Sequence, residues 1–371
     1  MQNKIAKDNW MASFCLVGKP KKSASGDFNI NIDETSNSGW RYNSMFLNVD
    51  CGEKHGSIGC EMSGGYWGNR SNHVIYAHGK NDDGSDDYTS TIQVDWNDRF
   101  NESILETVGD MCFTTVGLEK TENGSIVVKK FLSAYDAINY INEHLTDDMV
   151  VQVRGTMRYS MYQGNTQIRK NITSIMLSKT ENPEDFKAKF TQSILIDKDS
   201  ASLEDIDKEK GVMYVNARVL DYIKEVNGVE IKGQYPYNVQ FEYPMDTINS
   251  EQRKRIYDLL FKVRKDITQI TFVGDLVEGG AVVQATLDDI PDDIKELIAA
   301  GVYTEKEALV QCSANGGKEK RMILRQPMIK RVDDKPVVQK YEGKYTEDDF
   351  DFGNASDDTE DDDWLAALDA L

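Results

Sequence analysis

The chain has 371 residues, of which 39% are hydrophobic, enough to fill the cores of two or three ordinary domains, so a mainly disordered chain is excluded. Its formal net charge of −20 argues at first against a nucleic-acid partner. The charge is uneven, however, because residues 342–371 hold twelve acidic side chains and one Lys and carry −11. The preceding body therefore carries only −9, which is mild for its size.

The cysteines and the apolar runs indicate the compartment. The five cysteines form no regular framework, so we expect free thiols in a reducing cytosol; they are Cys15, Cys51, Cys60, Cys112 and Cys312. The apolar run Met11–Gly18 has no small-residue cleavage site after it, and no stretch approaches the roughly 20 apolar residues that cross a bilayer. We expect a soluble cytoplasmic protein without a membrane partner, in a bacterium or, if a virus encodes it, in the host cell.

The first block of the chain, about Trp10–Leu177, is typical of a β-rich domain with one helix. Apolar strands are expected at Met11–Gly18 and Trp40–Val49, with Gly- and Asp-rich loops after them. Ser133–Asp136 is a capping-box sequence, and apolar residues follow it at helical spacing, at Ile138, Ile141 and Leu145. This pattern predicts a helix.

A β-hairpin is expected to close the first block. Thr166–Leu177 forms its returning strand after a turn at Gln163–Asn165. The opening strand alternates, with apolar side chains and one ring on one face and polar side chains on the other: Val151, Val153, Met157 and Tyr159 against Arg154, Thr156 and Arg158.

A polar linker, Ser178–Asp185, separates a second block that repeats this order of elements. The expected elements are a strand at Gly211–Leu220, a turn at Asn227–Gly228, a strand at Tyr235–Tyr243, a helix capped by Ser250, a strand at Ile267–Leu276, a helix from Pro291 to Gly301, a capped helix at Thr304–Glu307 and a strand at Arg321–Lys330. Two blocks of strands, a helix and a strand hairpin indicate a diverged duplication.

The predicted hairpin is basic and aromatic. Residues 151–179 hold five basic side chains and no acid, and Tyr159 and Tyr162 lie beside them. Single-stranded nucleic acid needs cations along its phosphates and flat rings for its unpaired bases, which is the mixture found here. The alternative is a solvated hairpin whose Arg and Tyr side chains only face water.

Residues 151–169, with a valine-rich strand, a Gly, a basic-aromatic stretch and a Gly turn, resemble the terminal hairpin of bacterial single-stranded-DNA-binding proteins. Phe14–Gly18 resembles the first strand of that family, and the predicted helix lies where an OB-fold has one. The resemblance implies mainly β structure with inserted helices, an OB-like β-barrel and a disordered acidic C-terminal tail. Family members usually carry one OB-fold per chain, whereas the two blocks of this chain indicate two tandem OB-like β-barrels. The expected units are residues 1–180, which bind single-stranded DNA, 186–341, the second barrel, and 342–371, the tail.

The acidic tail is the second part of the resemblance. It ends in carboxylates followed by an apolar tip spaced for one face of a short helix, and we expect its docking residues to be Asp361, Asp362, Asp363, Trp364, Leu365 and Leu368. Family members dock replication and repair partners through such a tip, although theirs ends in Pro-Phe. The alternative is a tail that only aids solubility.

Further candidate contacts lie in both blocks. Trp40, Tyr42 and Trp67 could extend a stacking platform in the first block, and Lys318–Arg331 is a second locally basic segment. The full expected set of DNA-binding residues is Trp40, Tyr42, Trp67, Arg154, Arg158, Tyr159, Tyr162, Arg169, Lys170, Tyr235, Tyr237, Arg321 and Arg325.

Catalytic and metal motifs do not stand out. Cys51 and Cys60 lack a Cys-x-x-Cys knuckle, and no phosphate loop, nucleophile elbow or His-Glu-x-x-His sequence occurs, so we expect no enzyme, no cofactor and no metal.

The sequence thus favours a sequence-independent single-stranded-DNA-binding protein that recruits replication, recombination or repair proteins through its tail. The alternatives are an acidic protein-binding adaptor or DNA mimic, and a single-stranded RNA-binding protein. A homo-oligomer is possible.

Overall fold

The computed structural model describes residues 10–23, 26–180, 182–226, 229–246, 248–279, 295, 320–332 and 334–350. In this part the chain is mainly β, as predicted. The first block contains β1 (Ala12–Lys21), β2 (Asn29–Thr35), β3 (Trp40–Asp50), β4 (Ser57–Trp67), β5 (Val74–Lys80), β6 (Asp86–Asp95), α1 (Glu102–Leu105), β7 (Thr114–Lys120), β8 (Ile126–Phe131), α2 (Ala134–His144), β9 (Val151–Tyr162) and β10 (Asn165–Leu177).

The second block begins after the predicted linker. It contains β11 (Lys187–Ile196), β12 (Val212–Val226), β13 (Val229–Pro244), α3 (Ser250–Leu260), β14 (Ile267–Glu278), β15 (Lys320–Pro327), β16 (Ile329–Val332), β17 (Lys335–Val338) and β18 (Lys340–Tyr345). The helices predicted after Pro291 and at Thr304–Glu307 lie outside the described residues, apart from Lys295. None of the described helices has the length and hydropathy that crossing a bilayer needs.

Five strands of the first block close into a barrel. Their order is β1-β3-β4-β10-β9 and back to β1, and every pairing is antiparallel except the parallel contact between β4 and β10. The helix α2 directly precedes β9, which is the fourth barrel strand along the chain. This strand order and helix position are those of an OB-fold.

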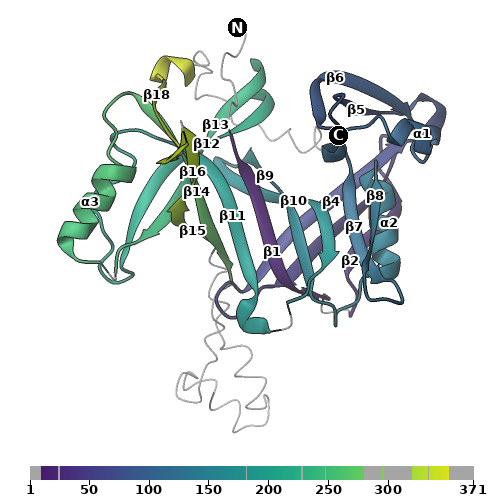
Figure 1. Cartoon of the computed structure of the whole chain (residues 1–371), viewed down its shortest axis with the longest axis horizontal. Helices are drawn as coiled ribbons and strands as arrows, with labels where there is room; N and C mark the ends of the chain where they lie inside the picture. Colours follow the sequence, from purple (N-terminus) through teal and green to yellow (C-terminus); the bar gives the residue numbers. More distant parts are fainter. Residues whose placement is uncertain are drawn as a thin grey trace.

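The second block repeats the same topology. Its order is β11-β12-β13-β15-β14 and back to β11, with β13 and β15 parallel. The helix α3 directly precedes β14, the fourth barrel strand along the chain. The two OB-like barrels share one 14-stranded sheet because β1 pairs with β11, where Phe14 lies opposite Phe190. Figure 1 shows β1 and β11 between the two barrels, with α2 and α3 at opposite ends of the molecule.

The two long helices begin at side-chain caps. Ser133 caps α2 as predicted: its hydroxyl accepts a hydrogen bond from the Tyr135 backbone N–H, 3.2 Å away. The Asp136 side chain of the predicted capping box instead accepts hydrogen bonds from Arg99. In α3 the predicted cap is one residue late: Asn249 is the N-cap and forms a capping box with Gln252, while Ser250 is the first helical residue. Asn and Ser are both favourable N-cap residues, so the sequence alone does not show which of two adjacent ones begins the helix.

The hairpin of the first barrel has the turn that its sequence predicts. Gln163 and Gly164 both have positive φ angles, 47° and 73°, which is the type I′ geometry of a two-residue hairpin turn. Gly155 on β9 is required for a different reason. A Cβ atom there would lie 1.9 Å from the carbonyl oxygen of Asn171, next to the irregularity in β10.

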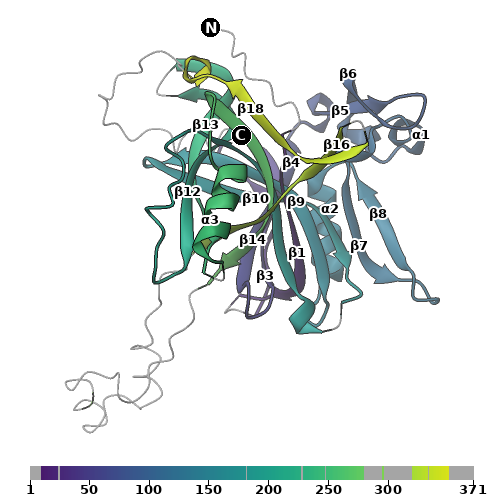
Figure 2. The same ribbon diagram turned by 60° about the vertical axis from the view of Figure 1, so that its left-hand side comes forward.

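Several elements are added to the barrels. The hairpin of β5 and β6 has its own small core, and β7 and β8 extend the shared sheet at the end opposite α3 (Figures 1 and 2). At the other edge β18 pairs with β14, and a 3-10 turn at Glu347–Phe350 follows it. The structured chain thus continues past the boundary predicted at residue 341.

Candidate nucleic-acid interface

The outer surface of β9, β1 and β11 forms a continuous polar face, which we call the central sheet face. It consists of two rows of residues that pair across the three strands: Arg154, Cys15 and Lys189, and Thr156, Ser13 and Thr191. The side chains between them on β1 and β11, such as Phe14 and Phe190, point into the core. Because β1 belongs to the first barrel and β11 to the second, this face joins the two barrels.

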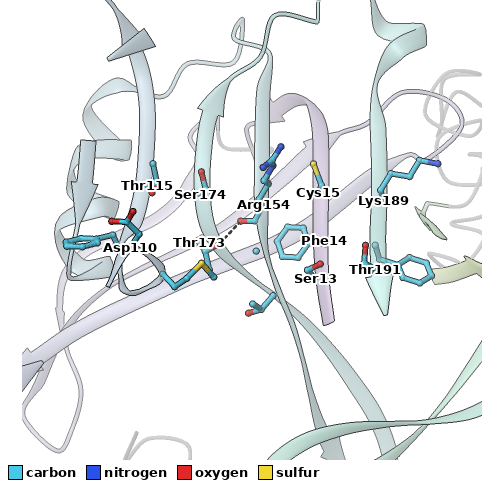
Figure 3. A pocket seen from close by; sticks show the side chains of 15 residues that line it. Ser13, Phe14, Cys15, Asp110, Thr115, Arg154, Thr173, Ser174, Lys189 and Thr191 are labelled. Atoms are coloured by element: carbon cyan, nitrogen blue, oxygen red, sulfur yellow. Dashed lines mark hydrogen bonds between the residues drawn. The ribbon is translucent and has the colours of Figure 1, made fainter. Parts of the chain in front are cut away.

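A hollow of about 400 Å³ lies on the central sheet face (Figure 3). Hydroxyl side chains from five strands line it, and Asp110, Met111 and Phe113, which directly precede β7, form its rim. Arg154 and Lys189 are the cations that line it. Hydroxyl and guanidinium groups are donors that fit phosphate oxygens.

Arg154 is the accessible cation of the hollow. Its side chain is exposed, and it has no acidic partner among the described residues. Lys189 instead contacts Asp275, which also accepts a hydrogen bond of 2.6 Å from Arg325. Burial tends to raise the pKa of Asp275, but the hydrogen bonds from Lys189 and Arg325 outweigh burial and lower the pKa.

The carboxylate on the rim is compensated. Lys130 and Lys80 lie 3.1 and 3.2 Å from the Asp110 carboxylate, and the hydrogen bond from Lys130, followed by that from Lys80, lowers the pKa of this group. Two cations therefore surround one anion. The rim does not oppose an approaching phosphate by itself.

An aromatic surface lies next to the central sheet face, on β3 and β4. Trp67 is 44% exposed and packs edge-on against Trp40, with 5.2 Å between ring centroids. Phe46 is also 44% exposed and covers Gly59 of the neighbouring strand, and Tyr42 is half-buried on the same face of β3. These are the second and third strands of the barrel, whose face and adjoining loops bind oligonucleotides in OB-folds.

Two other predicted contacts are exposed where expected. Tyr162 is 37% exposed at the end of β9. Arg169 lies on β10, directly opposite Arg158, with its guanidinium 4.0 Å from Glu61. Since β10 adjoins both β9 and β4, Arg169 lies between the central sheet face and the aromatic surface.

Three of the predicted DNA contacts are buried in this structure. Tyr159 is 4% exposed, and its hydroxyl donates a hydrogen bond of 2.7 Å to Gln192 of the second barrel. Tyr237 is 1% exposed and lies over the Tyr159 ring. Lys170 is 5% exposed and forms an ion pair with Glu278 of the second barrel. All three side chains hold the barrels together.

Arg158 has a mixed role. Its guanidinium lies 2.9 Å from the buried carboxylate of Asp221 on β12, while half of its side chain stays exposed. The same carboxylate accepts a hydrogen bond of 2.8 Å from the Tyr159 backbone N–H. Arg158 is therefore mainly a junction residue.

The second-barrel candidates are occupied by contacts within the barrel. Arg321 donates hydrogen bonds of 2.9 and 3.0 Å to the Glu242 carboxylate, and Arg325 is bound to Asp275. Tyr235 is half-buried against the Tyr237 ring. These contacts involve two of the six basic residues in Lys318–Arg331, Arg321 and Arg325.

Lys189 and Phe46 were missed by sequence reasoning. Lys189 alternates with Lys187 and Thr191 on one face of β11, which is a pattern that the OB-like repeat could have revealed. Phe46 has no such signal, because an aromatic residue in a strand is more often part of the core.

Among the described residues, no group of three potential metal ligands from His, Cys, Asp and Glu occurs. Burial raises the pKa of the Cys60 thiol to about 12 and also raises the pKa of Cys51, so both stay protonated. The predicted docking residues from Asp361 to Leu368 lie outside the described part of the chain.

Comparisons with known proteins add little to this description. A model of a family described as YorF matches residues 84–249, a segment that covers parts of both barrels. No curated protein matches the chain. Among solved structures, the wild-type single-stranded DNA binding protein from Thermus aquaticus is similar at 7% identity, covering 72% of this chain and 86% of that chain with a TM-score of 0.33. The OB-like assignment above therefore depends on the strand order of this chain alone.

Proposed function

We propose that the chain is a sequence-independent single-stranded-DNA-binding protein. The observation that carries the proposal is Arg154, an exposed cation without an acidic partner among the described residues, in a hydroxyl-lined hollow that spans both barrels. A phosphate is the group that such a site fits.

In the proposed complex, one strand crosses the central sheet face and continues over β10 to the aromatic surface. Arg154 and Arg169 contact phosphates, and bases stack on Trp67, Phe46 and Tyr162. Stacking of this kind tolerates any base because every base has a flat face.

Titration of the intact protein with oligo-dT, oligo-U and duplex DNA, followed by tryptophan fluorescence at several salt concentrations, tests the proposal. Salt-dependent quenching is expected with oligo-dT and not with duplex DNA. Equal affinity for oligo-U would assign RNA as a second ligand. No quenching by either oligonucleotide at low salt would contradict the proposal and favour an acidic protein-binding adaptor.

We further propose that the acidic tail recruits replication, recombination or repair proteins in the cytoplasm through its tip, from Asp361 to Leu368. The charge of −11 over residues 342–371 and the apolar side chains within it support this role. A chain that lacks residues 357–371 should lose such recruitment and bind oligo-dT more tightly at low salt, because fewer carboxylates compete with DNA. Unchanged or weaker DNA affinity would contradict the competition.

A further inference from the structure

The second barrel has a polar outer face on β12 and β13. Four side chains form it, in two pairs that lie directly opposite each other across the strands: Asn216 with Gln240, and Arg218 with Asn238. The Gln240 amide donates a hydrogen bond of 2.9 Å to Asn216. These strands are the second and third of the barrel, so this second-barrel face corresponds in topology to the aromatic surface of the first barrel.

A hollow of about 500 Å³ lies on the second-barrel face. The four side chains line it together with Asp197 and Glu347. Glu347 comes from the 3-10 turn after β18, at the start of the acidic C-terminal stretch. A carboxylate from the C-terminal segment of the chain thus lies in the second-barrel face.

Arg218 holds this carboxylate with both arms of its guanidinium. Its two terminal nitrogens each lie 2.8 Å from a different oxygen of Glu347, and one of them is 3.0 Å from Asp197. The hydrogen bond from Arg218 lowers the pKa of Glu347. This two-pronged geometry is also the one in which arginine binds phosphate.

The two acidic partners of Arg218 differ in how firmly they are held. Asp197 accepts further hydrogen bonds from the backbone N–H of Asp199 and from the Ser200 hydroxyl. The Glu347 side chain is 67% exposed, and within the described part of the chain its hydrogen bonds are to Arg218 alone. Glu347 can therefore leave while Asp197 stays.

The segment that carries Glu347 has its own anchor. Phe350 packs against Tyr345 with 5.7 Å between ring centroids, and it lies on a small buried cluster with Leu195 and Leu220. The turn can keep this apolar contact when the Glu347 side chain rotates away. Releasing the carboxylate does not require unfolding of β18.

We propose that the second-barrel face is a second contact surface for the phosphates of single-stranded DNA, closed by Glu347 until a phosphate replaces the carboxylate on Arg218. The inference rests on the proposed function. The exchange conserves charge, because one singly charged anion replaces another, and Asn216, Asn238 and Gln240 supply amide donors beside it. The strand that reaches this surface is the one that crosses the central sheet face.

Removing the charge of Glu347 tests the inference. Glu347→Gln and the wild-type chain are titrated with an oligo-dT of about 30 nucleotides, long enough for two barrels at roughly 4–16 nucleotides per OB-fold. The variant should bind roughly three- to fivefold more tightly, the effect expected when one exposed ion pair no longer competes. Glu342→Gln, which removes the same charge from β18, should bind like the wild type.

The double variant Arg218→Gln, Glu347→Gln should lose the gain, because the phosphate partner is then absent. Thermal unfolding of each variant checks that it is folded. Unchanged affinity in Glu347→Gln, an equal gain in Glu342→Gln, or a gain that persists in the double variant would each overturn the inference. Failure of the wild type to bind any oligonucleotide would instead overturn the proposed function.

Discussion

Trp67 is the side chain best placed to stack on a base. It is held edge-on by Trp40 at 5.2 Å and still presents 44% of its surface to solvent. A ring that is fixed by a neighbour loses little conformational freedom when a base stacks on it. Exposed tryptophan also reports on binding, because a stacked base changes its fluorescence.

Replacement of Trp67 by Ala should weaken oligo-dT binding roughly 5- to 150-fold, since one stacked base contributes about 1–3 kcal/mol. Trp67→Phe should retain most of the affinity and lose most of the quenching. The control variant is Tyr76→Ala, which changes a ring that is 70% exposed on the β5–β6 hairpin. It should bind oligo-dT with unchanged affinity. Normal binding by Trp67→Ala would remove the stacking role.

Asp275 gives a prediction on pH. Its pKa is lowered in the folded chain, so the ionised carboxylate stabilises the fold above the unfolded-state pKa of about 3.9, and this contribution is lost as the pH falls through the folded-state value. In urea unfolding between pH 7 and pH 3, Asp275→Asn should therefore lose less stability than the wild type. The control variant Asp205→Asn removes an exposed carboxylate and should lose as much stability as the wild type. Parallel curves for wild type and Asp275→Asn would contradict the assignment.

Alternation along β9 was enough to predict which side chains share a face, but it could not show what covers that face. Tyr159 lies on the apolar face together with Val153, and the structure places both in the core. Lys170 is covered because Glu278, 108 positions later in the sequence, reaches it from the other barrel. A basic residue in a basic hairpin gives no sequence signal for such a distant partner.

At the scale of elements, the pairing of β1 with β11 and the buried contacts beside it join the barrels. Lys170 and Glu278 form an ion pair across the junction, and Arg158 and Asp221 form another. His55 of the first barrel lies 3.0 Å through Nδ1 from the Leu276 carbonyl oxygen of the second. These contacts fix the two barrels relative to each other, so a bound strand meets one continuous surface.

Lys170→Met should lower the free energy of unfolding by about 3–5 kcal/mol, because it leaves the Glu278 carboxylate buried without its partner. Lys262→Met, which breaks the exposed pair with Asp258 on α3, should cost less than about 1 kcal/mol. Urea unfolding measures both changes. Stability equal to the wild type together with weaker oligo-dT binding would show that Lys170 contacts DNA after all.

Several elements of each barrel followed from local signals, since alternation, turn residues and caps are all short-range, but the barrel strands β4 and β11 were not predicted. The pairing of β1 with β11 had no such signal, because both strands contain apolar residues that could equally fill a separate barrel. The extension of the fold to Phe350 was also hidden, since the turn that follows β18 is acidic like the rest of the tail. Both the junction of the barrels and the extension to Phe350 depend on strand pairing between residues far apart in the sequence.

At the scale of the whole molecule, the position of the charges matters more than their sum. A net charge of −20 coexists with a central sheet face on which Arg154 is exposed and the nearby carboxylates Asp110 and Asp275 are each bound by two cations. Long-range repulsion by the remaining acids is screened beyond about 8–10 Å at physiological salt. Local contacts at the face can therefore prevail.

The salt dependence of oligo-dT binding by Arg154→Gln tests the central claim most directly. The affinity of the wild type should fall with salt, and the variant should show a slope of log K against log salt that is smaller by about 0.7, the value for one lost phosphate contact on a single strand. Arg255→Gln, which changes an exposed arginine on α3, should keep the wild-type slope. If Arg154→Gln also keeps the wild-type slope and affinity, DNA does not cross the central sheet face.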